Sequence, residues 1–452
     1  MTKSIITIDD LSLSQINSIF DLADEFLEKG AWKVRGRRRS ADQFILSTLF
    51  YEPSTRTRFS FESAMLRLGG HVISSADSAS TSAAKGETIA DTVRVMENYA
   101  DIIVIRHPWE GAARVAAEFS DVPIINAGDG AHEHPTQTLC DLYTLRREKK
   151  KLKDLNVLLC GDLKNGRTVH SLVYALARFG ADIHTRSAPG FGLPEHVRER
   201  LKNKYGFEPH EGDFDEIDAV YRAPDDQSNL FEVDLMLQQP SNRNRHERGR
   251  NIDACYVTRL QMERLEGGST GQYPVVNGKF LKKKRYAKSS VLHPLPRVDE
   301  LGYDMDRDPR GIYFKQASYG VPIRMALISA LLELKTSLAV DPQWKPYDYE
   351  VYSSRSGLRC RGSRCITNHD AERRHLVPKF WLVADKPVTL RCVYCEHELK
   401  PLLVGGCDSK AFASSSDWKS VKRENRVFFF DEDNARSQGF HPRRRKLKLV
   451  SA

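Results

Sequence analysis

The stretch Ser54–Arg58 reads Ser-Thr-Arg-Thr-Arg, so three hydroxyl groups and two guanidinium groups stand directly before a helical apolar pattern. Met65, Leu66 and Leu68 supply the apolar face of this predicted helix, and Gly69 is expected to end it. The first turn of a helix attracts anions because its N–H groups are unpaired, and arginine adds forked donors suited to phosphate. The stretch therefore predicts a phosphate-binding helix start. An ordinary capped helix with a solvated basic end is the simpler interpretation.

Four further polar clusters follow along the chain. Ser82 and Lys85 lie in a loop of small residues, and Arg106 ends an apolar strand. His134–Gln137 opens a helix with proline at its first position, which leaves His134 and Gln137 facing a cleft. The loop His293–Arg297, which reads His-Pro-Leu-Pro-Arg, has two prolines that fix its backbone. Each cluster has an ordinary structural explanation when it is taken singly, so only their combination carries information.

Alternating strands and helices must hold these clusters in place. Apolar strands are predicted at 44–50, 101–106, 122–126 and 155–160, and helices at 10–30, 136–151, 168–179 and 321–338. Ligands bind at the polar carboxyl ends of parallel strands, which is where Arg106 and His134 fall. The predicted fold class is α/β: two doubly wound parallel-sheet domains joined by interdomain helices, plus a small β-rich four-cysteine zinc domain.

Two pairs of cysteines predict that zinc domain. Cys360 and Cys365 are separated by four residues, and Cys392 and Cys395 follow 26 residues later with two residues between them. Four thiolates at this spacing are a strong pattern for tetrahedral Zn²⁺, which organises units too small to fold on their own core. His369, His375 and His397 are possible substitute ligands, but the two cysteine pairs need none of them. A structural Zn²⁺ and no organic cofactor are therefore expected.

Composition narrows the class of protein. The 452 residues, 40% hydrophobic and 29% charged, predict two or three globular domains. The start has no basic-then-apolar signal pattern and no apolar run approaches a membrane span, so a cytoplasmic protein with no membrane partner is expected. The net charge of +9 makes a nucleic-acid-binding zinc protein an alternative. That alternative leaves the anion-site residues unexplained, so no nucleic-acid partner is expected.

The clusters together resemble the catalytic chain of aspartate carbamoyltransferase over roughly residues 1–337. The resemblance is carried by Ser54–Glu62, Lys85–Thr88, Arg106–Pro108, His134–Asp141, Gly161–Leu172, Thr258–Arg264 and His293–Glu300. His-Pro-Thr-Gln and His-Pro-Leu-Pro favour the aspartate enzyme, because the ornithine enzyme typically has cysteine in both places. Residues 350–404 resemble the zinc domain of the regulatory chain of the same family, through Cys360, Cys365–Asn368 and Leu390–Glu396. The chain is thus interpreted as a natural fusion protein.

The resemblance implies a transferase that makes N-carbamoyl-L-aspartate and phosphate from carbamoyl phosphate and L-aspartate, an early step of de novo pyrimidine biosynthesis. Carbamoyl phosphate is assigned to Ser54, Thr55, Arg56, Thr57, Ser82, Lys85, Arg106, His134, Gln137, Leu295 and Pro296. Aspartate is assigned to Lys85, Arg167, Arg259, Gln261 and Leu295. The catalytic set is Arg56, Thr57, Lys85, Arg106, His134 and Gln137. By the family's pattern Thr57, Arg106 and His134 donate to the oxygen of the tetrahedral intermediate, and Gln137 holds the carbamoyl NH2.

The assignment of Arg259 depends on a departure from the family's pattern. Val220-Tyr221 and Cys255–Thr258 both look like the strand end that precedes the aspartate-binding arginine. Arg259 is chosen over Arg222 because Gln261 and the residues after it continue the family's pattern. Residues 222–250 are therefore interpreted as an insertion.

The resemblance also implies the domain organisation and the assembly. A carbamoyl phosphate-binding domain is expected at 1–138 with a returning helix at 317–338, and an aspartate-binding domain at 139–316. A linker is expected at 339–351, the zinc domain at 352–405, and a basic, flexible tail at 406–452. The family draws Ser82 and Lys85 from a neighbouring subunit, which predicts a homotrimer with shared active sites. Docking of the zinc domain on a neighbouring catalytic unit would allow a dimer of trimers linked through zinc domains.

The sequence leaves two alternative functions open. A carbamoyltransferase for a different amine acceptor shares the phosphate site, but Arg167, Arg259 and the Pro-Leu-Pro loop speak against it. A catalytically silent scaffold is the other alternative, and the presence of every expected catalytic residue speaks against it.

Overall fold

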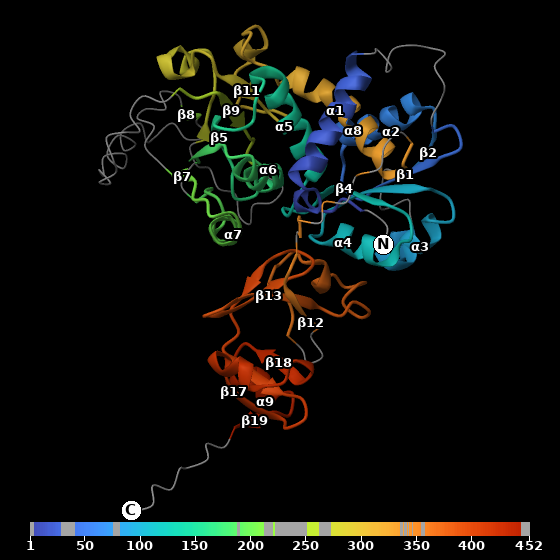
Figure 1. The fold of residues 1–452 in the computed structure, drawn as a ribbon, viewed down its shortest axis with the longest axis vertical. Coiled ribbons are helices and arrows are strands. Elements are labelled where there is room, and N and C mark those ends of the chain that lie inside the picture. Colours follow the sequence, from blue (N-terminus) through green and yellow to red (C-terminus); the bar gives the residue numbers. More distant parts are fainter. Residues whose placement is uncertain are drawn as a thin grey trace, which may run out of the picture.

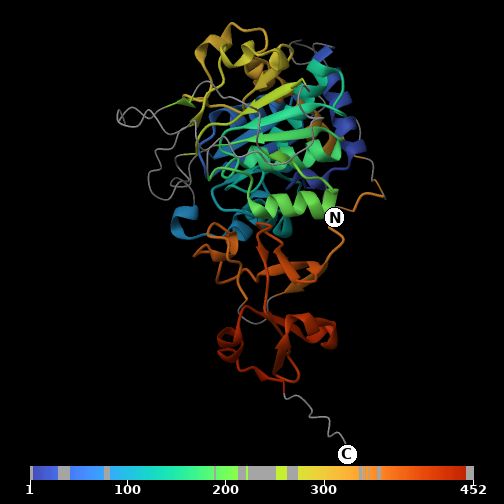
Figure 2. The ribbon, with the colours of Figure 1, turned by 90° about the vertical axis from the view of Figure 1, so that its left-hand side faces the viewer.

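The computed structural model describes residues 4–28, 41–75, 82–187, 190–211, 220–221, 251–261, 273–334, 338, 341, 343–345, 347–353 and 358–443. The insertion predicted at 222–250 lies outside these residues. Figure 1 shows a two-domain α/β body at the top, a small β unit beneath it and a second small β unit at the bottom. The view turned by 90° in Figure 2 keeps the same order, so the three bodies form a column.

The first domain is built on a parallel sheet in the order β2-β1-β3-β4. Its strands are β1 (Ile45–Phe50), β2 (His71–Ser75), β3 (Ile102–His107) and β4 (Ile124–Asp129), and its helices are α1 (Leu13–Glu28), α2 (Thr55–Leu68), α3 (Ile89–Met96) and α4 (Ala112–Phe119). Every residue of β3 and β4 is buried, as expected for central strands covered on both faces. The predicted strands and the predicted helix after Ser54 are confirmed, and Gly69 ends that helix with φ 93°.

The second domain carries a parallel sheet in the order β11-β9-β5-β6-β7. Its strands are β5 (Asn156–Cys160), β6 (Asp182–Arg186), β7 (His210–Glu211), β9 (Ala254–Val257) and β11 (Ser290–Leu292), and its helices are α6 (Arg167–Arg178) and α7 (Glu195–Tyr205). Two short strands, β8 (Val220–Tyr221) and β10 (Tyr273–Pro274), pair with each other outside that sheet. Only β9 of the two candidate strands therefore lies in the main sheet, and it leads directly to Arg259.

Two long helices join the domains. They are α5 (Pro135–Lys149) and α8 (Tyr313–Leu331), and they lie between the two sheets in Figure 1. The largest apolar core runs through both domains and includes Leu139, Tyr143, Ile323 and Leu327 from these helices. The bounds predicted for the returning helix, 317–338, are wrong, because it begins at Tyr313 and ends at Leu331. Proline is usually a helix-start signal, yet Pro322 lies inside this helix.

Two antiparallel sheets follow. The zinc domain contains β12 (Glu350–Ser353), β13 (Lys379–Asp385), β14 (Val388–Cys392) and β15 (Glu398–Leu399) in chain order. The C-terminal sheet has the order β18-β16-β17-β19, formed by β16 (Leu403–Gly406), β17 (Ala411–Ser414), β18 (Arg426–Phe429) and β19 (His441–Pro442), with helix α9 (Glu432–Arg436). Among the described residues, short 3-10 helices lie at Ile8–Asp10, Ser82–Lys85, Phe280–Lys282, Lys284–Tyr286, Tyr303–Asp306, Ile366–Asn368, Ser415–Ser420 and Arg423–Asn425.

The flexible tail predicted from residue 406 is wrong for residues 406–443, which are folded. Phe412, Val427, Phe429 and Phe440 form a small core of their own, and the rings of Phe429 and Phe440 are 4.8 Å apart. The many exposed polar and basic residues of this segment conceal that core in the sequence. Residues 444–452 lie outside the described part of the chain.

The described linker residues contact both domains of the α/β body and the zinc domain. The indole N–H of Trp344 donates to the carbonyl of Asp9 at 2.8 Å, and the ring of Tyr347 stacks on Trp381 with centroids 4.6 Å apart. The guanidinium of Arg178 lies over the Trp344 ring at 4.1 Å. The linker thus ties the zinc domain to the N-terminal segment.

The zinc domain docks on the first domain of its own chain. Glu110 pairs with Cys365 as an isolated β-bridge, and the N–H of Ile366 donates to the Glu110 carbonyl at 2.9 Å. Gly111 has φ 86°, and a Cβ there would lie 2.5 Å from the Cβ of Tyr394, so only glycine permits this approach. Ile89, Val93 and Val115 of the body share one apolar core with Tyr394 and Leu390. The docking surface expected to meet a neighbouring unit is therefore occupied within the chain.

Candidate functional site

The Ser54–Arg58 stretch forms the start of α2. Ser54 is the residue before the helix, and its side chain makes no capping hydrogen bond. Thr57 is buried, whereas Thr55 and Arg56 are exposed. Partial desolvation of its guanidinium, and after it the nearby charge of Arg259, lower the pKa of Arg56. The guanidinium groups of Arg56 and Arg259 thus lie close enough to repel each other, which favours binding of an anion between them.

Arg106 and Arg167 hold one carboxylate between the two domains. Arg106, near the end of β3, donates from Nη2 to Oε1 of Glu52 at 2.8 Å. Arg167, the first residue of α6, donates from Nη2 to the same oxygen at 2.8 Å and from Nη1 to Oε2 at 3.0 Å. Arg167 lies against Gly128, where a Cβ would be 3.0 Å from the guanidinium carbon. This arginine fork, defined as Arg106 and Arg167, already has the bidentate geometry that carboxylates and phosphates favour.

His134 lies beside the arginine fork at the start of α5. Its backbone N–H donates to the Ser171 hydroxyl at 2.9 Å, which fixes the start of the helix against α6. The side chain is buried, and burial together with Arg106, Arg167 and Arg324 holds the pKa of His134 well below its ordinary value. The imidazole is therefore neutral near pH 7. A neutral imidazole keeps one N–H group, so His134 can still donate one hydrogen bond to a ligand.

Gln137 is positioned by a buried carboxylate that sequence reasoning did not assign. Its Nε2 donates to Oδ1 of Asp141 at 2.8 Å, and Gln316 Nε2 donates to the same oxygen at 2.6 Å. The Tyr256 hydroxyl donates to Oδ2 at 2.8 Å. Burial raises the pKa of Asp141 to about 7 despite these three donors. Asp141 thereby links α5 and α8 to strand β9.

Arg259 and Gln261 follow β9 at the carboxyl end of the second sheet. Arg259 donates from Nη1 to the carbonyl of Leu260 at 3.0 Å. The Gln261 backbone N–H donates to Oδ2 of Asp162 at 3.2 Å, so the loop after β5 anchors this segment. Arg56 and Arg259 are among the charges that lower the pKa of His293, after burial. Residues from α2, β9 and the His293–Arg297 loop therefore face one space.

The His293–Arg297 loop is fixed internally. His293 pairs through Nε2 with Oε1 of Glu300 at 2.7 Å, and its Nδ1 accepts from the Leu295 N–H at 2.8 Å. Leu295 has φ 57°, a left-handed conformation that leucine rarely adopts. Pro296 is exposed. A strained backbone held by buried hydrogen bonds is a common means of aiming carbonyl groups at a ligand.

Ser82 and Lys85 stand apart from the other candidates. They form the 3-10 turn before α3, and both are exposed. Within the described residues, neither makes a hydrogen bond or an ion pair with the arginine fork, His134 or Arg259. The structure of one chain thus brings together the other candidates but not these two.

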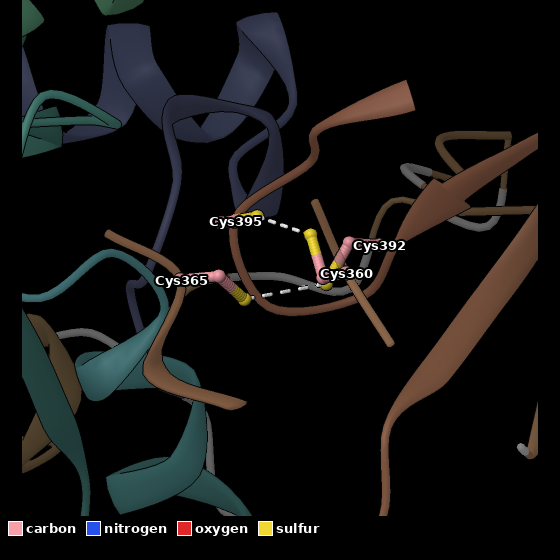
Figure 3. Close-up of side chains that lie close together, drawn as sticks. All are labelled: Cys360, Cys365, Cys392 and Cys395. Carbon is pink, nitrogen blue, oxygen red and sulfur yellow. Dashed lines mark hydrogen bonds between the residues drawn. The ribbon is translucent and has the colours of Figure 1, made fainter. Parts of the chain in front are cut away.

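The four cysteines converge on one point, as Figure 3 shows. The Sγ atoms of Cys360 and Cys395 are 3.4 Å apart, those of Cys365 and Cys392 are 3.8 Å apart, and all four lie within 4.8 Å of one another. A tetrahedral centre with Zn–S bonds of about 2.3 Å has sulfur–sulfur edges of about 3.8 Å, so the thiols fit Zn²⁺. The chain carries a four-cysteine metal centre.

The surroundings of these thiols favour a bound cation. The Gly362 N–H donates to Cys360 Sγ at 3.3 Å. Hydrogen bonds from the neighbouring thiols hold the pKa of Cys365 far below its ordinary value. All four cysteines are buried, and a buried thiolate needs a positive partner. Four converging sulfur atoms can all bind one metal ion, which supplies that positive charge.

Three family models match the chain. Residues 3–147 match the carbamoyl-P binding domain of aspartate/ornithine carbamoyltransferase, and residues 153–331 match the Asp/Orn binding domain. Residues 353–401 match the metal binding domain of the aspartate carbamoyltransferase regulatory chain. The α/β body is thus that of a carbamoyltransferase, and residues 402–443 lie beyond the matched ranges.

Individual relatives are more specific. The aspartate carbamoyltransferase catalytic subunit of Clostridium botulinum is 44% identical over 332 residues, which are 72% of this chain and 96% of the relative. That of Thermoplasma acidophilum is 43% identical over 338 residues, 73% of this chain and 98% of the relative. The solved catalytic subunit of M. jannaschii aspartate transcarbamoylase is 42% identical, with a TM-score of 0.60 over 74% of this chain and 99% of the other.

A Trypanosoma cruzi aspartate transcarbamoylase, solved in complex with N-(phosphonacetyl)-L-aspartic acid, is 33% identical with a TM-score of 0.58. The alignment covers 74% of this chain and 95% of the other. The chain belongs to the aspartate carbamoyltransferase family. This confirms the resemblance, the fold class and the enzyme class predicted from the sequence. Within the described residues, no helix is long and apolar enough to cross a membrane.

Proposed function

We propose that the chain transfers the carbamoyl group of carbamoyl phosphate to the α-amine of L-aspartate, giving N-carbamoyl-L-aspartate and phosphate. The observation that carries this proposal is the arginine fork, in which Arg106 and Arg167 hold the Glu52 carboxylate between two domains. Two forked donors that already bind an internal anion suit the phosphate and carboxylate groups of the two substrates. In this proposal the Glu52 carboxylate occupies the place of a substrate anion and is displaced from the two arginines when substrate binds.

Carbamoyl phosphate binds first in this proposal. Its phosphate lies at the start of α2, where Ser54, Thr55, Arg56 and Thr57 donate to it, and Arg106 completes the contacts. Ser82 and Lys85 supply further donors to the same group. Gln137, held by Asp141, binds the carbamoyl NH2 together with the carbonyls of Leu295 and Pro296. The carbonyl carbon is thereby fixed in place for attack.

The amine of aspartate then attacks that carbon, and the carbonyl oxygen becomes negative. Thr57, Arg106 and His134 donate to this oxygen, and a single such donor typically lowers the barrier by about 3 kcal/mol. The carbonyl re-forms as the bond from carbon to the bridging phosphate oxygen breaks, and phosphate leaves with that electron pair and takes up the proton that the amine nitrogen releases. Because His134 is neutral, it stabilises the oxygen as a hydrogen-bond donor rather than as a cation.

Aspartate is recognised by the second domain. Arg167 and Arg259 each bind one of its carboxylates, with Gln261, Lys85 and the Leu295 carbonyl as further contacts. Support for Arg259 comes from β9, the only one of the two candidate strands that lies in the parallel sheet. Arg167 must exchange Glu52 for the substrate, so aspartate binding is tied to a rearrangement between the domains.

The assembly in this proposal is a homotrimer, with Ser82 and Lys85 contributed by the neighbouring subunit. Their exposure and their separation from the other site residues in one chain support that arrangement. The metal is a structural Zn²⁺ held by the four cysteine thiolates, and the chain is a natural fusion that uses no organic cofactor. We place the enzyme in the cytoplasm, at an early step of de novo pyrimidine biosynthesis.

An assay with alternative acceptors tests the reaction. The purified chain is incubated with labelled carbamoyl phosphate and either L-aspartate or L-ornithine, and the carbamoylated product is identified by mass. We expect product with aspartate and at least about a hundredfold less with ornithine, whose cationic side chain meets the arginine carboxylate site. Preferential carbamoylation of another amine would overturn the acceptor assignment.

Mixed assemblies test the shared site. Lys85→Ala and His134→Ala chains, each poorly active alone, are mixed under conditions that exchange subunits. Interfaces that combine the intact Lys85 of one chain with the intact His134 of another should regain activity, up to about a quarter to a third of the wild-type value. No recovery after exchange has been verified by mass would place both residues in a site within one chain.

A further inference from the structure

Three buried side chains converge where the zinc domain meets the body, outside both the arginine fork and the four-cysteine centre. His132 and Glu133 belong to the loop that leads to His134, and Glu396 directly follows Cys395. One ligand atom from each lies within 4.8 Å of the others. Their side chains are only 7%, 1% and 5% exposed, respectively. Potential metal-binding atoms from two domains thus share one enclosed space.

Each of these side chains is anchored through one atom and leaves another without a hydrogen-bond partner. His132 pairs through Nδ1 with Oδ2 of Asp129 at 3.0 Å, and Glu133 Oε2 accepts from the Ile8 N–H at 2.9 Å. Glu396 Oε2 accepts from Arg200. The remaining atoms, His132 Nε2, Glu133 Oε1 and Glu396 Oε1, are buried and have no hydrogen-bond partner in the described structure. Buried polar atoms of this kind require an explanation.

The pairing with Asp129 prepares His132 to bind a metal. A metal-bound histidine usually donates its other ring N–H to a carboxylate, which fixes the ring and its tautomer. With the proton on Nδ1, the lone pair of Nε2 points away from Asp129. A protonated imidazole is the alternative: despite burial, Asp129 and the other nearby carboxylates raise the pKa of His132. Nε2 of that imidazole would lie 3.8 Å from Glu396 Oε2, outside hydrogen-bond distance, so a metal would replace a proton that has no acceptor.

The charges around this space leave room for a cation. Four buried carboxylates, Asp9, Asp129, Glu133 and Glu396, lie in one network with three cations, Arg178, Arg200 and Lys204. The network therefore has one excess negative charge when His132 is neutral. Arg200 Nη1 lies 3.5 Å from Glu133 Oε1, so a bound ion would share the space with a guanidinium. It would coordinate the two Oε1 atoms, while Arg200 keeps Glu396 Oε2.

We propose that His132, Glu133 and Glu396 form a second divalent-metal site that fastens the zinc domain to the loop leading to His134. One imidazole nitrogen and two carboxylate oxygens suit Zn²⁺, and three protein ligands leave a position for water. The site binds a metal only when the zinc domain is docked, because Glu396 comes from that domain. The inference does not depend on the proposed reaction.

Metal analysis of the full chain tests this site. The protein is purified, equilibrated with Zn²⁺, freed of unbound metal, and its metal content is measured by mass spectrometry of the elements. We expect two equivalents of zinc per wild-type chain and one in His132→Asn and in Glu396→Gln. The matched control His441→Asn, which alters an exposed histidine of the C-terminal sheet, should keep two.

Substitution with Co²⁺ separates the two sites and reports on folding. Cobalt at the four-cysteine centre gives an intense sulfur charge-transfer band, which both variants should retain, since that centre is unchanged. The weaker visible bands of the nitrogen–oxygen site should disappear in the variants alone. One zinc per wild-type chain would overturn the proposal and leave a protonated His132 or a bound water in that space. A variant that lost the sulfur band would be replaced by the other variant for the comparison.

Discussion

The four-cysteine centre and the arginine fork are two different kinds of binding site for a charged group. The cysteine ligands come from one stretch, 360–395, and all four sulfurs are buried together. The arginine fork joins Arg106 of the first domain to Arg167 of the second through Glu52. A structural centre is thus closed by local chain segments. The proposed substrate site is instead built across two domains, and in the proposal the carboxylate that holds it is exchanged for substrate.

The two regions also differ in which charge is in excess. At the anion site burial, and after it the neighbouring arginines, lowers the pKa values of Arg56 and His134, so further positive charge is disfavoured there. At the cysteine centre four buried thiols converge at a spacing that suits a cation. An anion should therefore stabilise the first region and a metal cation the second. Substituting the residues that bind these ions should have effects of different size in the two regions.

The largest effect should follow loss of the metal centre. Cys360→Ser removes one of four thiolates, and binding of a structural Zn²⁺ contributes on the order of 10 kcal/mol to folding of such domains. We expect the zinc domain to become sensitive to proteolysis and the chain to unfold at lower temperature. Cys407→Ser, which changes a cysteine outside the centre, is the control and should behave as wild type. Continued protection in Cys360→Ser would mean that packing on the body alone holds the domain.

The next effect concerns the phosphate side of the anion site. Arg56→Ala should lower kcat by about a thousandfold, roughly 4 kcal/mol, while the fold survives. The control is Arg58→Ala in the same helix turn, where Arg58 pairs with Glu62 at 3.6 Å. That control should stay within about threefold of wild type. Steady-state kinetics measures kcat of both variants, and circular dichroism checks that both are folded. Similar kcat values for the two variants would show that Arg56 does not belong to the site.

A smaller effect is expected on the aspartate side. Arg259→Ala should raise KM for aspartate by about a hundredfold, roughly 3 kcal/mol, because one carboxylate loses its forked partner. Binding of carbamoyl phosphate, followed by calorimetry, should remain close to normal. Arg222→Ala is the matched comparison, and we expect it to have little effect. The reverse result would show that the insertion was assigned to the wrong segment.

The smallest effect is a pH dependence of stability. Burial raises the pKa of Asp141 to about 7, while an exposed aspartate titrates near pH 4. The folded state therefore keeps a proton that the unfolded state has released, and stability falls as pH rises through this window. Between pH 5 and pH 7 the loss should be about 2 kcal/mol.

Asp141→Asn removes this titration. Urea unfolding of wild type and variant at pH 5 and pH 7 should show a smaller decrease for the variant by that amount. Equal pH dependence in both proteins would mean that Asp141 is ionised throughout, held by its three donors.

Local patterns were enough to predict much of the molecule. The hydroxyl and arginine stretch before α2, the glycine at its end and the two cysteine pairs each depend on residues close in sequence. Glu52 and Asp141 were not predicted, because their roles depend on partners that lie over 50 residues away or on other helices. No spacing rule connects such residues before the fold is known.

The C-terminal sheet was missed for a different reason. Its core is small, with Phe412, Phe429 and Phe440 spread among basic and polar residues, so composition alone favoured a flexible tail. The start of α8 was missed because Gly320 and Pro322 are read as breaks, although the buried helix accommodates both. Packing against neighbouring elements overrides local preference in both cases.

The covalent connection through Trp344 and Tyr347 changes how docking of the zinc domain responds to dilution. A domain on a short tether meets its surface at an effective concentration in the millimolar range, whatever the concentration of the protein. An interface with an intrinsic dissociation constant of about 0.1 mM would then be closed in roughly nine molecules of ten. Two separate chains with the same contacts would come apart at micromolar concentration. The tether also sets a fixed ratio of one zinc domain to one catalytic unit, independent of how much of either is made.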